Sequence, residues 1–163
     1  MEFQGFEIVC PACQGDLNYD HQVTPGYTCS ECSAFYPVIF KIPDFRIYPD
    51  PYISIEADQV KGLWLAEYFD QFDFEALVHF YYENTPAVSA IQARQYTRGV
   101  LAAENRARST LDTWGLTGDL ALSTNPTRVL EIGCGTGPLI VAAHSLPVKM
   151  IGVDIAFRWL IVA

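Results

Sequence analysis

Two pairs of cysteines near the start of the chain have the spacing of a metal site. Cys10 with Cys13 and Cys29 with Cys32 are CxxC pairs separated by fifteen residues. Each pair offers two thiolates from one tight turn, and four thiolates complete a tetrahedral zinc site with no open position. Iron binds similar pairs and remains an alternative, whereas disulfides do not suit a chain without an export signal. We predict structural Zn²⁺, with His21 an exposed loop residue and not a ligand.

A glycine-rich turn forms the second candidate site. Gly133, Gly135 and Gly137 alternate directly after a predicted strand and directly before a predicted helix. Glycines let the backbone turn sharply and approach a ligand closely, and the first N–H groups of a helix can meet a polar group. Asp154 ends the next predicted strand, where a carboxylate can reach the hydroxyls of a ribose. The pattern predicts a nucleoside-containing ligand.

Two familiar ligand classes fit this turn poorly. A dinucleotide-binding GxGxxG turn requires a glycine where this chain has Pro138, and a phosphate-binding P-loop requires Gly-Lys-Ser/Thr. A nicotinamide-dependent enzyme is therefore a weak alternative.

The turn resembles motif I of class I S-adenosylmethionine (SAM) dependent methyltransferases. Its pattern of an acid followed by three alternating glycines is matched by Glu131 and the glycines after it, and residues 152–155 look like the second motif of that family. By this resemblance, Asp154 holds the ribose of SAM and the turn passes beneath its methionine part. The implied cofactor-binding residues are Glu131, Gly133, Cys134, Gly135, Thr136, Gly137, Asp154 and Ile155.

The cysteine-rich segment is similar to zinc ribbons that precede methyltransferase domains in bacterial proteins. It also resembles the small zinc-containing subunits that activate some RNA and protein methyltransferases. The two resemblances together cover about residues 6–47 and 127–160. They imply a zinc ribbon attached to a transferase, with the ribbon acting by default as a stabilising element.

The remaining pattern predicts the elements that position these sites. Aromatic and β-branched residues at 34–40 predict a strand that residues 42–44 end, and residues 48–53 read as a linker. We expect a helix capped by Ser54, a second helix at 74–83, and a long third helix that starts at Thr85-Pro86 and runs to Trp114. Parallel strands at 127–132 and 148–153 should flank a helix at 138–145, with another helix beginning at 155–163.

The predicted fold class is α/β, with three parts in order. A small β zinc ribbon occupies residues 1–48. A helical connector and the first βαβ unit of a Rossmann-like SAM-binding domain occupy residues 54–163. Only two of the roughly seven strands of such a sheet are expected, and no stop signal follows the last helical turns, so we expect an incomplete domain.

Other side chains are weaker candidates. The aromatic run between Tyr68 and Tyr82 could cover a cofactor, but aromatic residues at helical spacing usually form core. His79 within it could be a base, although a hydrogen-bonded packing histidine is the simpler interpretation. Tyr96 and Arg98 lie where related enzymes bring residues over the SAM carboxylate. No catalytic base can be assigned.

Charge and composition favour some partners over others. Nineteen acidic against ten basic residues give a net charge of −9, which disfavours a nucleic-acid surface. The N-terminus lacks the features of a signal peptide, and no apolar stretch is long enough to span a membrane, so we expect a cytoplasmic protein.

We therefore expect a SAM-dependent methyltransferase acting on a small molecule or metabolite. One alternative is a non-catalytic zinc-ribbon module that docks to a partner protein or self-associates through its incomplete sheet. Another is an RNA methyltransferase, because the ribbon resembles subunits that activate such enzymes.

Overall fold

The chain forms a mixed α/β structure that divides into two compact units. The computed structural model describes residues 2–22, 24–117 and 127–163. The first unit is Met1–Asp58 and the second is Gln59–Ala163, so the division falls within a helix. Each unit is considered by itself below.

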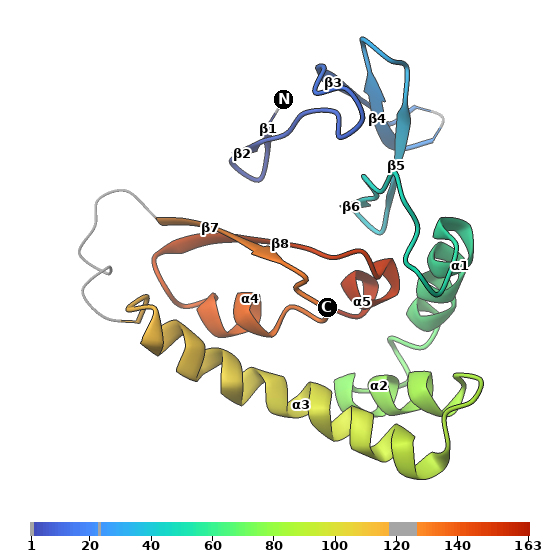
Figure 1. Cartoon of the computed structure of the whole chain (residues 1–163), viewed down its shortest axis with the longest axis vertical. Helices are drawn as coiled ribbons and strands as arrows, with labels where there is room; N and C mark the ends of the chain where they lie inside the picture. The colour runs from blue at the N-terminus through green and yellow to red at the C-terminus, as the bar shows by residue number, and fades with distance from the viewer. Residues whose placement is uncertain (1, 23, 118–126) are drawn as a thin grey trace. The chain divides into compact units, whose positions relative to one another are not determined.

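The first unit is built from short antiparallel strands (Figure 1). Two of them, β1 (Glu2–Phe3) and β2 (Phe6–Glu7), pair as a small hairpin. The other four follow one another in the curled order β3-β4-β5-β6. They are β3 (Leu17–Asp20), β4 (Gly26–Cys29), β5 (Phe35–Ile39) and β6 (Ile42–Pro43).

The prediction that residues 42–44 only end the strand at residues 34–40 is wrong. Phe40 and Lys41 both have positive φ, at 51° and 64°, and form a two-residue turn after β5. Two consecutive left-handed residues match the twist of a hairpin, so the chain reverses and β6 pairs with β5. Pro43 is tolerated there because it lies on an edge strand.

A small core and a buried ionic cluster hold the first unit together. Leu17, Tyr27 and Tyr36 are buried with Cys10 and Cys29. Beyond this core, the Arg46 guanidinium binds both oxygens of Asp44, at 2.6 and 2.8 Å, and one oxygen of Asp58 at 2.7 Å. The side chains of these three residues are at most 9% exposed, so the cluster ties the segment after β6 to the first turn of the following helix.

The first three helices agree with the sequence except at the start of the longest one. They are α1 (Ile55–Ala66), α2 (Phe74–Glu83) and α3 (Ala90–Thr113). Ser54 caps α1 by accepting the Ala57 N–H, as predicted. In contrast, α3 does not start at Thr85-Pro86: the Thr85 hydroxyl bonds back to a carbonyl of α2, and Ala87 has a φ of 65°. A capping box between Ser89 and Gln92 starts α3 instead.

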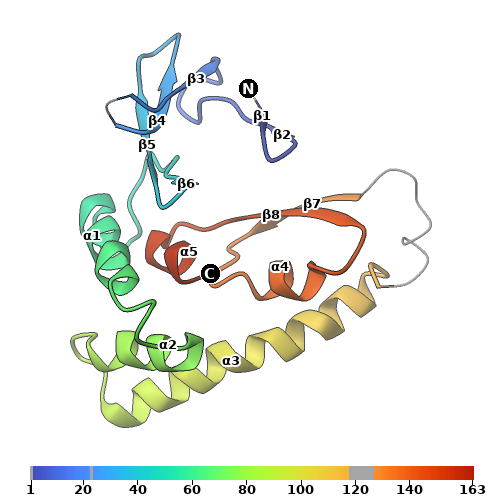
Figure 2. The same cartoon turned by 180° about the vertical axis from the view of Figure 1, so that it is seen from behind.

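A βαβ unit follows at the end of the chain. The strands β7 (Thr127–Ile132) and β8 (Val148–Val153) have the predicted bounds and pair in parallel. Between them lies α4 (Pro138–Ala143), shorter than predicted, and α5 (Phe157–Val162) follows β8. Figures 1 and 2 show α4 and then α3 on the same side of the strand pair. Apolar residues of α3, α4 and both strands form a shared core there.

The second unit has a further core of aromatic residues. Leu65, Leu77, Val78 and Tyr81 are buried, and most of the aromatic run packs against them, including Tyr68, Phe72 and Phe80. This arrangement confirms the interpretation of the run as ordinary core, except at Phe69 and Phe74, which are exposed; Tyr82 also packs against this core. No helix among residues 2–22, 24–117 and 127–163 has the length and apolar character to cross a membrane.

Candidate functional site

Each CxxC pair lies in a turn of the same construction. In the first, the Gln14 N–H donates to the Cys10 carbonyl at 2.7 Å, and in the second, the Ser33 N–H donates to the Cys29 carbonyl at 3.1 Å. Gln14 and Ser33 both have left-handed φ values, of 64° and 60°. The repeated geometry turns both cysteines of each pair toward one point.

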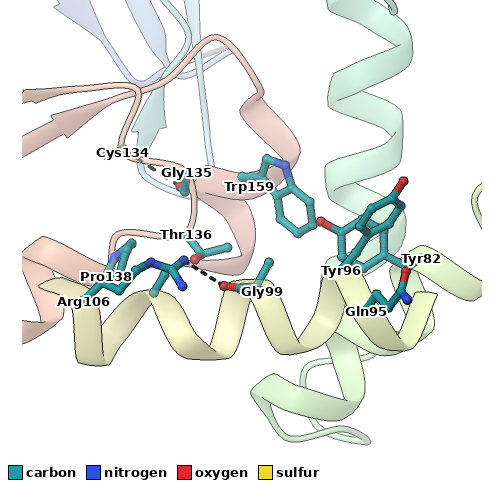
Figure 3. Close-up of a pocket in the computed structure, with 12 residues that line it drawn as sticks. Tyr82, Gln95, Tyr96, Gly99, Arg106, Cys134, Gly135, Thr136, Pro138 and Trp159 are labelled. Carbon is teal, nitrogen blue, oxygen red and sulfur yellow. Dashed lines mark hydrogen bonds between the residues drawn. The ribbon is translucent and has the colours of Figure 1, made fainter. Parts of the chain in front are cut away.

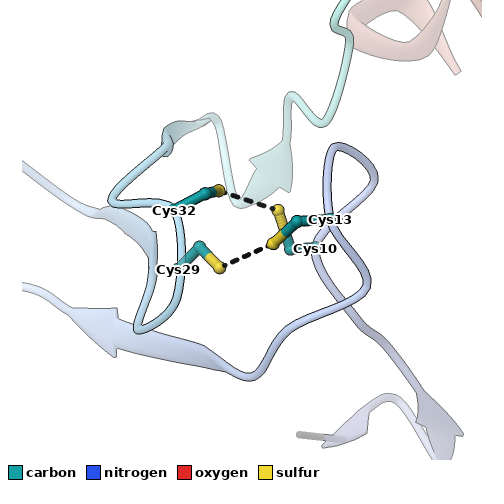
Figure 4. A group of neighbouring side chains, drawn as sticks. All are labelled: Cys10, Cys13, Cys29 and Cys32. Carbon is teal, nitrogen blue, oxygen red and sulfur yellow. Dashed lines mark hydrogen bonds between the residues drawn. The ribbon is translucent and has the colours of Figure 1, made fainter.

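The four sulfur atoms lie close enough to bind one metal ion such as zinc (Figure 4). All lie within 4.8 Å of one another, with Cys10 Sγ 3.6 Å from Cys32 Sγ and Cys13 Sγ 3.4 Å from Cys29 Sγ. A tetrahedral ion with bonds of about 2.3 Å to sulfur separates its ligands by about 3.8 Å. The thiols are free and their spacing fits such an ion. His21 is exposed and stacks on Tyr19, outside the cluster.

Tyr36 supports the cluster from within the core, and the sequence did not single it out. Its hydroxyl makes a buried hydrogen bond of 3.2 Å with Cys10 Sγ. Burial of the Cys10 thiol opposes ionisation, but this bond and the backbone N–H groups of Cys13 and Ala12 outweigh it and lower the pKa of Cys10 to about 6. The surroundings of Cys10 therefore favour the thiolate that a metal requires.

The glycine turn in the second unit is closed by the acid at the end of β8. Gly135 donates its N–H to one oxygen of Asp154 at 2.7 Å, and Ala156 donates to the other at 2.7 Å. Gly133 and Cys134 both donate to the Val153 carbonyl. The turn is thus fixed against the end of the neighbouring strand.

The turn requires glycine for its backbone and leaves open space beside it. Gly133, Gly135 and Gly137 have φ values of 77°, 55° and 71°, which other residues rarely adopt. A Cβ added at Gly133 or Gly135 would meet nothing within 4 Å. By contrast, a Cβ at Gly152 would lie 2.7 Å from Cys134, so that glycine is needed for packing.

The two acids at the turn differ in their surroundings. Both oxygens of Asp154 accept backbone hydrogen bonds, whereas Glu131 Oε2 is buried and, among the described groups, has no hydrogen-bond partner. Burial, and secondly the charge of Asp154, raise the pKa of Glu131. Cys134 is buried, and its pKa is raised to about 11 by burial and then by the same two acids. These surroundings disfavour the thiolate that a nucleophile requires.

A pocket of about 460 Å³ lies between this turn and α3 (Figure 3). Its volume falls in the range of small-molecule sites, about 300–1,000 Å³. Of the eight predicted cofactor-binding residues, Cys134, Gly135 and Thr136 line it. Its other lining residues come from the helices: Tyr82, Gln95, Tyr96, Gly99, Val100, Ala103, Arg106, Pro138 and Trp159.

The remaining candidates lie around or away from this pocket. The other five predicted cofactor residues are not part of the lining, although Asp154 bonds directly to Gly135. Tyr96 lines the pocket but Arg98 does not, and the guanidinium found there belongs to Arg106, which donates to the Gly99 carbonyl at 3.0 Å. His79 bonds Thr97 at 3.3 Å and pairs with Glu83, outside the lining, which is the packing role considered from the sequence.

The helical spacing of Arg106 was a signal available in the sequence. Tyr96, Gly99, Ala103 and Arg106 recur every three or four residues and therefore share one face of α3. The small residues in the middle of that face leave room for a ligand. Comparison with protein-family models, curated proteins and solved structures finds no significant match for the chain.

Proposed function

We propose that the chain carries the SAM-binding site of a small-molecule methyltransferase, preceded by a structural zinc ribbon. One observation supports the proposal most strongly: the open pocket adjoins the glycine turn that Asp154 closes. A ligand in the pocket would meet the turn next to the acid that the resemblance assigns to a ribose.

The hydrogen bonding of the turn favours a ligand without phosphates. The N–H groups of Gly133, Cys134, Gly135 and Gly137 are all bonded to oxygens of the protein. A phosphate cradle requires such groups to point at the anion. SAM needs close approach of the backbone more than an anion nest, and the glycines supply it.

The residues present suit the chemical groups of SAM. Asp154 retains lone pairs on both oxygens for the ribose hydroxyls, because each accepts one backbone bond. Arg106 supplies a cation for the methionine carboxylate. When bound, SAM supplies an electrophilic methyl group, and the protein contributes mainly by positioning donor and acceptor.

The cysteine cluster has a separate, structural role in this proposal. Four thiolates leave no position for a substrate on a tetrahedral ion. The core beside them is small, so zinc binding adds the free energy that folds this unit.

The acidic charge supports a small acceptor over RNA. A net charge of −9 gives no general attraction for phosphates. Pro138 likewise disfavours a nicotinamide cofactor.

Calorimetric titration of the zinc-loaded chain with SAM, S-adenosylhomocysteine, NADH and ATP tests the proposal. We expect SAM and S-adenosylhomocysteine to bind saturably, and NADH and ATP not to bind. Gly135→Ala should weaken it more than tenfold, because a methyl group fills the space beside the turn. Gly115→Ala is the matched control, since Gly115 also has positive φ and no atom near its Cβ position but lies outside the pocket lining. Preferential binding of NADH or ATP, or no nucleoside binding by the folded chain, would refute the proposal.

A further inference from the structure

One end of the pocket is lined by aromatic rings that the SAM site does not require. Tyr82 of α2, Tyr96 of α3 and Trp159 of α5 meet there, and we call these three residues the aromatic wall. Figure 3 shows them on one side of Gly99, with Arg106, Thr136 and Pro138 on the other. The pocket therefore has a glycine-turn end and an aromatic end.

Tyr82 contacts both other rings of the aromatic wall. The Tyr82 ring centre lies 5.2 Å from that of Tyr96 and 5.7 Å from that of Trp159, with an interplanar angle of 51° in each pair. These distances are those of direct ring contacts. Because Tyr82 packs against both other rings while Tyr96 is 45% exposed, a flat ligand can stack on the Tyr96 ring.

The charges around the aromatic end disfavour a cationic ligand. Arg158 Nε donates to the Tyr81 hydroxyl at 3.0 Å, and Lys61 Nζ lies 4.5 Å from the Tyr81 ring centre. Tyr81 packs directly on Tyr82 and Trp159, so both positive charges lie close behind the aromatic wall. None of the described residues that line the pocket is acidic.

The two ends of the pocket lie at separate positions along α3. Tyr96 and Arg106 are ten residues apart on α3, which corresponds to about 15 Å along the helix. Gln95 adds an amide at the aromatic end that can bond a hydroxyl or amine.

We infer that the aromatic wall binds the methyl acceptor, and that this acceptor is a flat, uncharged aromatic compound with a hydroxyl or amine. The identification of this ligand as the methyl acceptor rests on the proposed function. The binding of aromatic rings by the aromatic wall is independent of SAM. It assigns the glycine-turn end to the cofactor and the aromatic end to the substrate.

Fluorescence anisotropy of 2-naphthol, titrated with the zinc-loaded full chain without SAM, tests this inference. We expect saturable binding that cyclohexanol and tetramethylammonium do not displace. Tyr96→Ala should weaken it between about two- and tenfold, while Tyr96→Phe, which keeps the ring, should bind as the wild type does. Because Tyr96 is 45% exposed, its truncation should leave the fold intact. Ile91→Ala removes an exposed apolar side chain of the same helix outside the pocket and serves as control.

Three results would overturn the inference: equal binding by Tyr96→Ala, displacement by cyclohexanol, or displacement by tetramethylammonium. Binding of 2-naphthol by a chain that fails to bind SAM would support the aromatic wall and refute the proposed function. Binding of SAM by a chain that does not bind 2-naphthol would support the proposed function and refute the role of the aromatic wall.

Discussion

The Asp154 carboxylate lies 2.7 Å from the backbone nitrogen of Gly135, so the acid that ends β8 holds the glycine turn that follows β7. Its second oxygen accepts the N–H of Ala156 at the start of α5. One side chain therefore fixes two backbone segments, and its role in folding is separable from any role in binding a ribose.

Asp154→Ala should lower the free energy of unfolding of the second unit by about 1–3 kcal/mol, because two backbone N–H groups lose their acceptor. Urea unfolding followed by tryptophan fluorescence measures this, since all three tryptophans lie in that unit. Lys149→Ala changes an exposed residue of the same strand and should have little effect. Equal stability of the two variants would show that the contact contributes nothing.

Tyr36→Phe should weaken zinc binding about tenfold, because groups that hydrogen-bond a metal ligand typically contribute 10- to 100-fold to affinity. A metal-bound Cys10 thiolate has no proton, so the Tyr36 hydroxyl is the donor in this bond. Competition with a chromophoric chelator measures the affinity, and the thiolate-to-cobalt absorption of the Co²⁺-loaded chain should shift. Tyr27→Phe removes a hydroxyl from the same core and is the control. Unchanged affinity and spectrum in Tyr36→Phe would contradict the role.

Arg46→Ala should destabilise the first unit by about 3–5 kcal/mol, since it leaves Asp44 and Asp58 buried without their shared cation. Arg46→Lys should recover only part of this loss, because an ammonium cannot match the two-bond contact with Asp44. Release of zinc to a chelator during urea unfolding reports on this unit alone. Lys41→Ala changes an exposed residue and should unfold at the same urea concentration as the wild type. An unfolding midpoint of Arg46→Ala equal to that of the wild type would refute the prediction.

Glu131→Gln should stabilise the chain at pH 7. The raised pKa of Glu131 means that the folded chain keeps a proton that the unfolded chain has already lost. This carboxyl therefore reduces stability as pH rises from about 4.3, the ordinary glutamate value, through its folded pKa. The difference between variant and wild type should grow over that interval and be absent at lower pH.

Unfolding midpoints measured from pH 3.5 to pH 8 test this dependence. Glu75→Gln, an exposed glutamate of α2, provides the control and should show no such trend. A variant that is less stable than the wild type at pH 7 would mean that Glu131 has a stabilising partner in the folded chain.

Local sequence signals were sufficient for some elements and not for others. The bounds of β7 and β8 were predictable because each is a short segment with several aliphatic residues that ends at a glycine or at a polar residue. The start of α3 was not, because Thr85-Pro86 satisfies the same capping rules as Ser89. The choice depends on the Thr85 hydroxyl bonding back to α2 and on the left-handed Ala87 between the two.

At the candidate sites, too, local sequence signals were sufficient for some residues and not for others. The spacing of the four cysteines was sufficient to predict that they cluster, because each CxxC pair forms a local turn. Arg98 does not line the pocket, since residues two positions apart on a helix point to nearly opposite sides and it cannot share the face of Tyr96. Tyr82 and Trp159 join that face only through the packing of α2 and α5, which no local pattern encodes.

Hydrogen exchange of the zinc-loaded chain with and without SAM tests the central claim most directly, because it reports where the cofactor binds. We predict slower exchange in peptides covering residues 133–138, 154–156 and 96–106, and unchanged exchange in the four-cysteine turns. Absence of protection at a SAM concentration that saturates known methyltransferases, or protection confined to the first unit, would contradict the account.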